Sequence, residues 1–189
     1  EDHIAKVFNP HLGGLGAAFA DRREVATIVE QLIGEPSQVF QSQFIFKNPG
    51  AWGQPWHQDA FYFPFDRRPE IGVWLAISEA TLENGCLAVI PGGHRSAIHP
   101  HGPDLRPGAN YGYTEIAGLP EDQAVPLLMQ PGDCLFFHSL LPHRSYDNTS
   151  TRRRSALVCH YTARSAQLTG PPSPVQKAIL RFRPVGRAA

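Results

Sequence analysis

Two histidines and one aspartate carry the clearest chemistry in this sequence. His57 and Asp59 are two residues apart, and His143 lies far downstream. Two imidazoles and one carboxylate can hold an iron(II) ion on one face and leave the opposite face open for a co-substrate and dioxygen. Arg154, eleven residues after His143, could supply the cation that an anionic co-substrate needs. This set of residues predicts an enzyme rather than a binding module.

The His57–Asp59 pair also has an ordinary interpretation. On a strand, residues two apart point to the same face, so both side chains could reach one metal ion. The alternative is a surface histidine followed by an aspartate that caps a turn. His138, five residues before His143, competes for the place of third ligand. Its position in an apolar run favours a hydrogen-bonded core histidine instead.

One amphipathic helix is predicted ahead of the strands. Asp21 and Glu24 resemble a capping box at its start, and Gly34 can end it. Apolar residues repeat with helical spacing between these points. They are Val25, Ile28, Val29, Leu32 and Ile33.

Short strands are predicted through the rest of the chain. They cover residues 39–47, 71–78, 86–90, 125–129, 133–138 and 155–162. Asn84-Gly85 predicts a hairpin turn between the second and third of these strands. Many short strands with one flanking helix indicate a mainly β fold, a double-stranded β-helix (jelly roll, cupin-like). We expect a single domain over residues 1–189, and the absence of a methionine at Glu1 leaves open a further N-terminal segment.

Composition narrows the partners. The 189 residues include 17 basic and 17 acidic side chains, a balance that offers no nucleic-acid or membrane-surface footprint. The apolar runs are strand-sized, so no membrane insertion is expected. The three cysteines lie in apolar runs, which predicts buried free thiols and a cytoplasmic location. A small-molecule substrate is the expected partner, and the oligomeric state is left open.

Four segments of the chain together resemble a known family. They are QSQFIFKNP, PWHQDAFYFPF, GVWLAISEATLENGCLAVIPGGH and GDCLFFHSLLPHRSYDNTSTRRRSAL. In this order and spacing they are similar to the phytanoyl-CoA dioxygenase family of iron(II)- and 2-oxoglutarate-dependent oxygenases. The resemblance runs from about Gln41 to Tyr161, most of the chain.

The resemblance implies a fold, a cofactor set and an activity. It implies a jelly-roll core that uses iron(II), 2-oxoglutarate and dioxygen to hydroxylate an unactivated C–H bond of a small organic substrate, releasing succinate and carbon dioxide. Its iron ligands map onto His57, Asp59 and His143, and its 2-oxoglutarate arginine maps onto Arg154. Further pocket residues near the co-substrate map onto Ser145, Trp74, Gln43 and Lys6. Related halogenases lack the carboxylate ligand, so Asp59 favours hydroxylation.

The choice among three consecutive arginines follows from strand geometry and the resemblance together. On a strand, Arg152 and Arg154 share one face and Arg153 points away. The position eleven residues after the histidine selects Arg154, whose planar fork can hold a carboxylate with two hydrogen bonds. Arg152 and Arg153 are expected to be solvated.

Two alternatives and one substrate hypothesis remain open. A cupin-type metalloenzyme on a similar barrel would not use 2-oxoglutarate and would not need Arg154. A non-catalytic member of the fold would bind metal or ligand only. On a regular strand Phe61 and Phe63 would face the iron, which predicts an apolar pocket for a lipid-like or acyl substrate, although aromatic core packing explains both residues equally well. Residues 91–120 form a long Gly/Pro-rich loop, in which Tyr111 and Tyr113 could belong to a lid.

Overall fold

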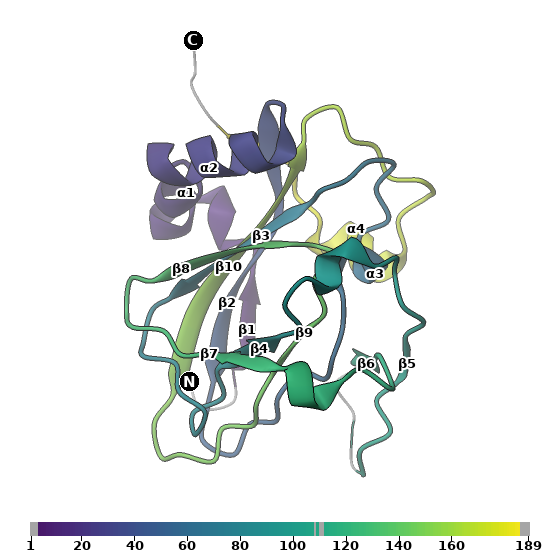
Figure 1. Cartoon of the computed structure of the whole chain (residues 1–189). Helices are drawn as coiled ribbons and strands as arrows, with labels where there is room; N and C mark the ends of the chain where they lie inside the picture. Colours follow the sequence, from purple (N-terminus) through teal and green to yellow (C-terminus); the bar gives the residue numbers. More distant parts are fainter. Residues whose placement is uncertain (1–3, 108, 110–111, 186–189) are drawn as a thin grey trace.

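Two antiparallel sheets face each other, and helices α1 and α2 cover the outer face of the larger one (Figure 1). The computed structural model describes residues 4–107, 109 and 112–185. The strands are β1 (Lys6–Phe8), β2 (Ser37–Lys47), β3 (Ile71–Ala76), β4 (Leu87–Val89), β5 (Gly102–Pro103), β6 (Thr114–Glu115), β7 (Val125–Leu127), β8 (Cys134–His138), β9 (His143–Ser145), β10 (Arg154–Ala163) and β11 (Arg183–Pro184). The helices are α1 (Gly14–Ala20), α2 (Arg23–Ile33), α3 (Asp59–Tyr62) and α4 (Pro174–Ile179), with 3₁₀ turns η1 (Pro10–Leu12), η2 (Gly93–Arg95) and η3 (Glu121–Gln123).

The sheet order explains how distant parts of the chain meet. The larger sheet runs β1-β2-β10-β3-β8, with β11 pairing to β2, and the smaller sheet runs β7-β4-β9. The pairings within both sheets are antiparallel. This two-sheet arrangement with flanking helices confirms the predicted jelly-roll class.

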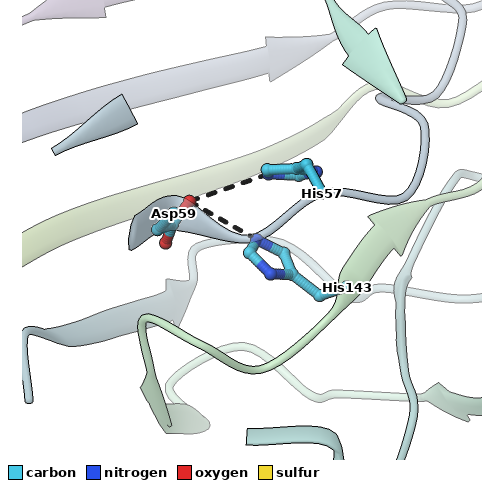
Figure 2. A group of neighbouring side chains, drawn as sticks. All are labelled: His57, Asp59 and His143. Carbon is cyan, nitrogen blue, oxygen red and sulfur yellow. Dashed lines mark ion pairs between the residues drawn. The ribbon is translucent and has the colours of Figure 1, made fainter. Parts of the chain in front are cut away.

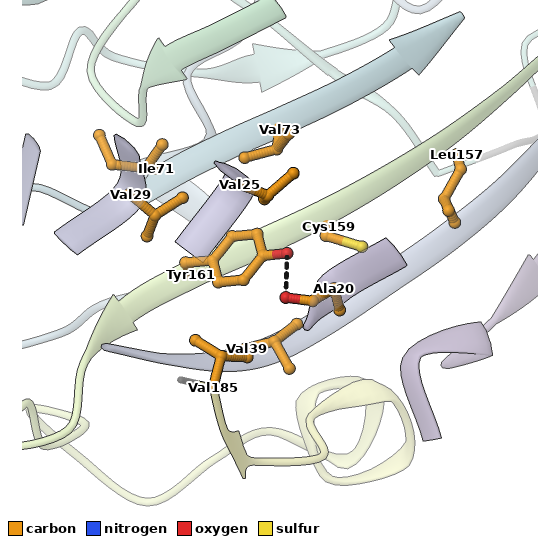
Figure 3. Packing of buried hydrophobic residues seen from close by; sticks show 10 residues of the cluster. All are labelled: Ala20, Val25, Val29, Val39, Ile71, Val73, Leu157, Cys159, Tyr161 and Val185. Carbon is orange, nitrogen blue, oxygen red and sulfur yellow. Dashed lines mark hydrogen bonds between the residues drawn. The ribbon is translucent and has the colours of Figure 1, made fainter. Parts of the chain in front are cut away.

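Alternation along β10 separates the core from the interior between the sheets. Leu157, Cys159 and Tyr161 project from one face and pack against α1 and α2, where the Tyr161 hydroxyl donates to the carbonyl of Ala20 at 3.3 Å (Figure 3). The residues between them project to the opposite face, toward the smaller sheet. These are Arg154, Ala156, Val158 and His160.

A bulge in β2 brings its polar residues onto that same interior face. His160 pairs with Gln41 while the next residue, Tyr161, pairs with Val39, so Phe40 is the extra residue. The Phe40 ring packs edge-on against two aromatic rings, with centroid distances of 4.9 Å in each case. Beyond the bulge every second residue faces the interior, and these residues are Gln41, Gln43, Ile45 and Lys47.

The predicted hairpin at Asn84-Gly85 is wrong. β3 already has β10 on one side and β8 on the other, so it has no free edge for β4. β4 pairs instead with β7 and β9 in the smaller sheet. The turn carries the chain between sheets, and the Asn84 side chain closes it by accepting from the Thr81 amide at 2.8 Å and donating to the Glu79 carbonyl at 2.9 Å.

The prediction of one leading helix is incomplete, and its capping box is wrong. α2 spans Arg23–Ile33 and ends at Gly34, as predicted, with φ of 86° at that glycine. Asp21, however, is the C-cap residue of α1, and its carboxylate accepts from the Arg183 guanidinium at 2.8 Å. Because α1 ends with Asp21 as its C-cap, this residue is not available to cap the N-terminus of α2, whose N-cap is Arg22.

One of the three cysteines departs from the prediction of buried thiols. Cys86 and Cys159 are buried, but Cys134 is exposed because it begins β8, an edge strand of the larger sheet. Among the described residues, none of the helices combines the length and apolarity that crossing a membrane requires.

Glu70 gives the fold a pH-dependent stability term. This carboxyl is buried beside Arg68 and Ser139, and burial raises its pKa from 4.5 to about 7. A raised folded-state pKa means that stability falls as pH rises from about 4.5 to about 7, because the folded state must then hold a buried carboxylate. Glu70→Gln should remove this term. At 1.36 kcal/mol per pKa unit, the variant should gain about 3 kcal/mol relative to wild type between pH 4.5 and pH 8.

Urea unfolding of both proteins at these two pH values measures the difference. An equal stability difference between variant and wild type at both pH values would contradict the assignment of this term to Glu70.

Candidate metal centre

The two histidines are fixed to each other through their backbones. His57 and His143 form an isolated antiparallel bridge, in which each amide donates to the other's carbonyl at 3.0 Å. The bridge joins the segment before α3 to β9 of the smaller sheet. Residues 86 positions apart therefore present their imidazoles side by side, with ring centroids 4.1 Å apart.

Asp59 completes a group of three candidate metal ligands. Its Oδ1 lies 3.7 Å from His57 Nε2 and 3.8 Å from His143 Nε2 (Figure 2). The three ligand atoms all lie within 4.8 Å of one another, and all three residues are buried. Neutral imidazole nitrogen with a hard carboxylate oxygen is a donor set that suits iron(II).

Backbone carbonyls orient both histidines for coordination. His57 Nδ1 lies 2.8 Å from the Pro55 carbonyl oxygen, and His143 Nδ1 lies 3.0 Å from that of Leu141. A carbonyl can only accept, so each Nδ1 carries the hydrogen and donates it. Each Nε2 therefore keeps its lone pair on the side of Asp59. Fixing the tautomer through the second ring nitrogen is the usual arrangement of metal-binding histidines.

The surroundings of His57 and Asp59 favour the protonation states that a cation needs. Burial, followed by the neighbouring His143, lowers the pKa of His57 to about 3, so its imidazole is neutral at neutral pH. Burial pushes the pKa of Asp59 upward, but the imidazoles of His143, His160 and His57 outweigh burial and hold the pKa below its usual value. His57 thus offers a neutral nitrogen beside the Asp59 carboxylate.

The local conformation around Asp59 differs from the predicted strand. His57 lies on the bridge, but Asp59 begins the short helix α3, so strand alternation does not continue through the aromatic residues. Phe61 consequently points away from the interior, is 42% exposed and stacks on the His101 ring at 4.1 Å. Tyr62 and Phe63 face the cavity in its place. The prediction for Phe61 is wrong, and Phe63 lies where it was expected.

A cavity of about 450 Å³ opens beside the three residues, between the sheets. The structure brings each of the pocket residues predicted from the sequence to its wall. They are Arg154, Ser145, Trp74, Gln43 and Lys6. Lys6 reaches the cavity from β1, with its ammonium 5.3 Å from the centre of the Tyr113 ring, and burial lowers its pKa to about 8.

Arg154 is a buried cation with unused hydrogen-bond donors. It is 2% exposed, and its Nη2 donates to the Gly85 carbonyl at 2.9 Å. Its Nε and Nη1 have no hydrogen-bond partner among the described residues. The guanidinium lies 5.3 Å from the centre of a Trp74 ring. A buried guanidinium with free donors on a cavity wall is suited to bind a carboxylate.

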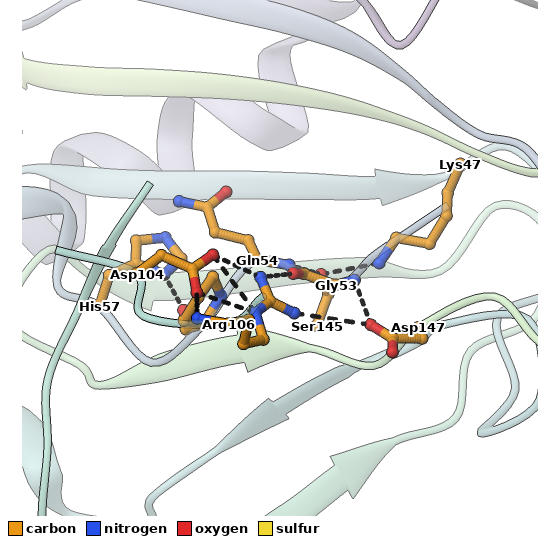
Figure 4. Close-up of polar contacts among 9 residues, drawn as sticks. Lys47, Gly53, Gln54, His57, Asp104, Arg106, Ser145 and Asp147 are labelled. Atoms are coloured by element: carbon orange, nitrogen blue, oxygen red, sulfur yellow. Dashed lines mark hydrogen bonds and ion pairs between the residues drawn. The ribbon is translucent and has the colours of Figure 1, made fainter. Parts of the chain in front are cut away.

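Lys47, which the sequence reasoning missed, lies at the same end of the cavity. Its ammonium donates to Ser145 Oγ at 2.9 Å and to the Tyr146 carbonyl at 2.5 Å (Figure 4). The backbone amide of Gln54 donates to the same Ser145 Oγ at 3.0 Å. A hydroxyl oxygen has two lone pairs, so Ser145 is saturated as an acceptor and its own O–H remains free to donate. Burial and the nearby Arg154 lower the pKa of Lys47 to about 6.

The neighbouring loop is held against this end by Arg106. Its guanidinium binds Asp104 and donates to the Gly53 carbonyl at 2.9 Å (Figure 4). Gly53 has to be glycine because a Cβ there would lie 1.9 Å from the Ser145 carbonyl oxygen. Of the two tyrosines expected in a lid, Tyr113 lines the cavity and Tyr111 lies outside the described residues.

The other histidines divide into one missed site residue and several structural ones. His160, which was not predicted as a site residue, is buried in the cavity wall with its Nδ1 3.5 Å from Asp59 Oδ2. His160 lies six residues after Arg154 on β10, so strand alternation places both side chains on the same face and could have identified it. His138 is hydrogen-bonded as predicted, since its Nδ1 accepts from the Leu140 backbone amide at 2.9 Å, but it is half-buried on the edge strand β8 and is not a core residue. His101 Nε2 accepts from the backbone amide of Gln58 at 3.0 Å.

Comparison with known proteins identifies the family whose sequences this chain matches. A sequence profile described as phytanoyl-CoA dioxygenase (PhyH) matches residues 3–156. Peroxisomal phytanoyl-CoA dioxygenase of Homo sapiens is 35% identical over 149 residues, covering 74% of this chain and 44% of the human protein. The probable phytanoyl-CoA dioxygenase of Caenorhabditis elegans is 36% identical over 151 residues, covering 72% of this chain and 47% of the worm protein. The chain thus spans about half the length of these relatives.

Solved structures share the fold. The crystal structure of EctD from S. alaskensis with 2-oxoglutarate and 5-hydroxyectoine aligns with a TM-score of 0.76 at 23% sequence identity. The alignment covers 98% of this chain and 66% of that chain. At this level of identity the likeness supports the architecture, and the chemistry rests on the residues described above.

Proposed function

Because the chain belongs to the phytanoyl-CoA dioxygenase family, we propose that it is an iron(II)- and 2-oxoglutarate-dependent dioxygenase. The proposal includes hydroxylation of an unactivated C–H bond in a small organic substrate. The observation that carries it is the convergence of two Nε2 atoms and one carboxylate oxygen beside a cavity that also holds a buried arginine.

The residues of this chain fit the metal and the co-substrate. His57, Asp59 and His143 would bind iron(II), since both imidazoles are neutral-tautomer donors and the carboxylate supplies charge. Arg154 would bind the distal carboxylate of 2-oxoglutarate through its free Nε and Nη1, and the Ser145 hydroxyl would donate to it. Trp74, Gln43 and Lys6 would shape the same pocket from β3, β2 and β1 of the sheet that also holds Arg154.

The protein contributes position and exclusion of water. When bound, iron(II) and 2-oxoglutarate supply the oxidising chemistry, with dioxygen as oxidant and succinate and carbon dioxide as by-products. Backbone hydrogen bonds hold the histidine rings, and the buried walls keep water from competing for the carboxylates. A cupin-type enzyme that does not use 2-oxoglutarate would have no use for the free donors of Arg154, which favours the dioxygenase over that alternative.

Succinate formation tests the proposal. The purified chain, supplied with iron(II), ascorbate, dioxygen and 2-oxoglutarate, should form succinate slowly even before a substrate is known. The rate should fall to background when iron is chelated and return when it is restored. Iron-independent succinate formation, or none above the protein-free control, would contradict the proposal.

Lys47 provides a separate prediction about the co-substrate pocket. Lys47→Met keeps the length of the side chain but removes the donor that occupies Ser145 Oγ. The serine hydroxyl should then lose its fixed direction. We expect the Kd of 2-oxoglutarate to rise about tenfold, equivalent to about 1.4 kcal/mol, with iron(II) affinity unchanged.

Isothermal titration with 2-oxoglutarate under anaerobic conditions measures this effect. Lys177→Met, at an exposed position on α4, is the matched control and should bind like wild type. Unchanged 2-oxoglutarate affinity in a folded Lys47→Met protein would show that Lys47 does not act on the pocket.

A further inference from the structure

Gln41 is a fully buried amide that finds no hydrogen-bond partner in the described part of the chain. It lies on β2 directly after the bulge, is 0% exposed and contributes to the cavity wall. Neither its Nε2 nor its Oε1 has a hydrogen-bond partner among the described residues. A buried polar group without partners destabilises a protein, so such a group on a cavity wall points to a ligand.

Another buried glutamine in the same chain shows the contrast. Gln58 is equally inaccessible, yet its Nε2 donates to the carbonyls of Ala97 at 3.2 Å and Leu140 at 2.7 Å. Its Oε1 accepts from the His99 amide at 2.8 Å. Gln58 thus has the complete partner set of a structural amide and holds the neighbouring loop. Gln41 has none of these contacts, so packing the fold does not account for its amide.

The position of Gln41 places it away from the predicted carboxylate pocket. Gln41 pairs with His160 on the neighbouring strand, and Lys47 pairs with Arg154. The two pairs are six residues apart along their strands, so their backbone positions are separated by about 20 Å at 3.3 Å per residue. His160 Nδ1 lies 3.5 Å from Asp59 Oδ2. Gln41 is therefore the strand neighbour of the histidine that lies beside Asp59, and the pair of Lys47 and Arg154 follows further along the same two strands.

The cavity that Gln41 lines combines amide side chains with aromatic walls. Gln43 and Gln54 also line the cavity, together with Tyr62 and Phe63. A pocket with apolar walls and a few polar points orients a ligand through those points. A primary amide side chain offers one acceptor and two donors in one plane, so it is best matched by a group that also carries a donor next to an acceptor.

We propose that Gln41 recognises the substrate, and that the substrate carries a carboxamide-like group, with a hydrogen-bond donor beside an acceptor, near the carbon that reacts. The inference rests on the proposed dioxygenase function, which it deepens by naming the substrate class. It replaces the lipid-like substrate suggested by the aromatic residues after Asp59, since a hydrocarbon chain would leave Gln41 without partners. Arg154 and Lys47 keep their separate role at the other end of the cavity.

A matched pair of small probes tests the inference on the iron-free protein. Hexanamide and 2-heptanone have the same size and shape, but only the amide carries an N–H donor. Titration followed by ligand-observed NMR should show hexanamide binding at least about fivefold more tightly than 2-heptanone, since a site built to hydrogen-bond discriminates against an analogue that lacks the group. In Gln41→Leu this preference should disappear, while Gln130→Leu, at an exposed position, should keep it.

The stability of the Gln41→Leu variant distinguishes ligand recognition from a structural role, because loss of a structural residue would destabilise the protein. Replacing an unsatisfied amide with leucine should let the protein unfold at a higher urea concentration than wild type. Equal binding of the two probes to wild type, no binding of hexanamide, an unchanged preference in Gln41→Leu, or a less stable variant would each overturn the inference. The probe titration needs no iron, so its result is independent of the succinate assay, and failure of the dioxygenase proposal is recognised separately.

Discussion

Asp59→Ala is expected to lose iron(II) binding and 2-oxoglutarate-dependent turnover together. Asp59 supplies the one anionic oxygen of the three-residue centre, and its Oδ1 lies within 3.8 Å of both histidine Nε2 atoms. Without it, two neutral imidazoles remain to bind a dication. Losing a partner outside the coordination shell already costs about 10–100-fold in metal affinity, so losing a ligand should cost at least about 100-fold.

The fold should survive this substitution. Asp59 is held by no hydrogen bond through its Oδ2 among the described residues, and the bridge between His57 and His143 is made by backbone groups. Circular dichroism and urea unfolding check that the variant is folded, and anaerobic iron(II) titration measures its affinity. Asp122→Ala, at an exposed position in η3, is the control that should behave like wild type. A folded Asp59→Ala protein with full activity would remove Asp59 from the ligand set.

Arg154→Gln is expected to keep iron(II) but lose 2-oxoglutarate. The guanidinium is 2% exposed, and its free Nε and Nη1 face a cavity in which a carboxylate could accept from both. Glutamine preserves some polarity but neither the charge nor the fork. Removing one side of a buried, charge-assisted pair typically costs about 2–5 kcal/mol, so the Kd of 2-oxoglutarate should rise at least about 30-fold.

Two further variants separate charge from geometry at this position. Arg154→Lys keeps the charge but not the planar fork, so its affinity should fall between wild type and Arg154→Gln. Arg152→Gln changes a neighbouring arginine that is exposed and paired with Glu79 at 3.3 Å, and it should bind 2-oxoglutarate normally. If Arg154→Gln bound 2-oxoglutarate as tightly as wild type, the co-substrate would have to bind elsewhere in the cavity.

The choice of Arg154, eleven residues after His143, is the part of the site that sequence reasoning predicted best. Arg154 lines the cavity, and β10 begins at this residue, so Arg152 and Arg153 lie before the strand and its alternation does not apply to them. Alternation along β10, counted from Arg154, would have placed His160 in the cavity. His160 was missed because a histidine in an apolar run has an ordinary core interpretation, and its proximity to Asp59 depends on where α3 lies in space.

The errors arose where tertiary pairing overrides local sequence signals. Asn84-Gly85 makes a tight turn, but both edges of β3 are already taken, so the turn connects two sheets. Phe61 points away from the cavity because the chain becomes helical at Asp59. The His-x-Asp spacing alone does not reveal this change from strand to helix. Lys47 could not be found from spacing, since its role depends on Ser145, 98 residues away.

Visible absorption during anaerobic titration with iron(II) and then 2-oxoglutarate tests whether the chain binds 2-oxoglutarate at an iron centre. If His57, Asp59 and His143 hold iron(II) and 2-oxoglutarate binds to it, a weak charge-transfer band should need both additions and should be absent in His143→Ala. The contradicting result is iron(II) binding without any band on addition of 2-oxoglutarate. In that case the metal centre would stand, but the chain would not be a 2-oxoglutarate-dependent dioxygenase.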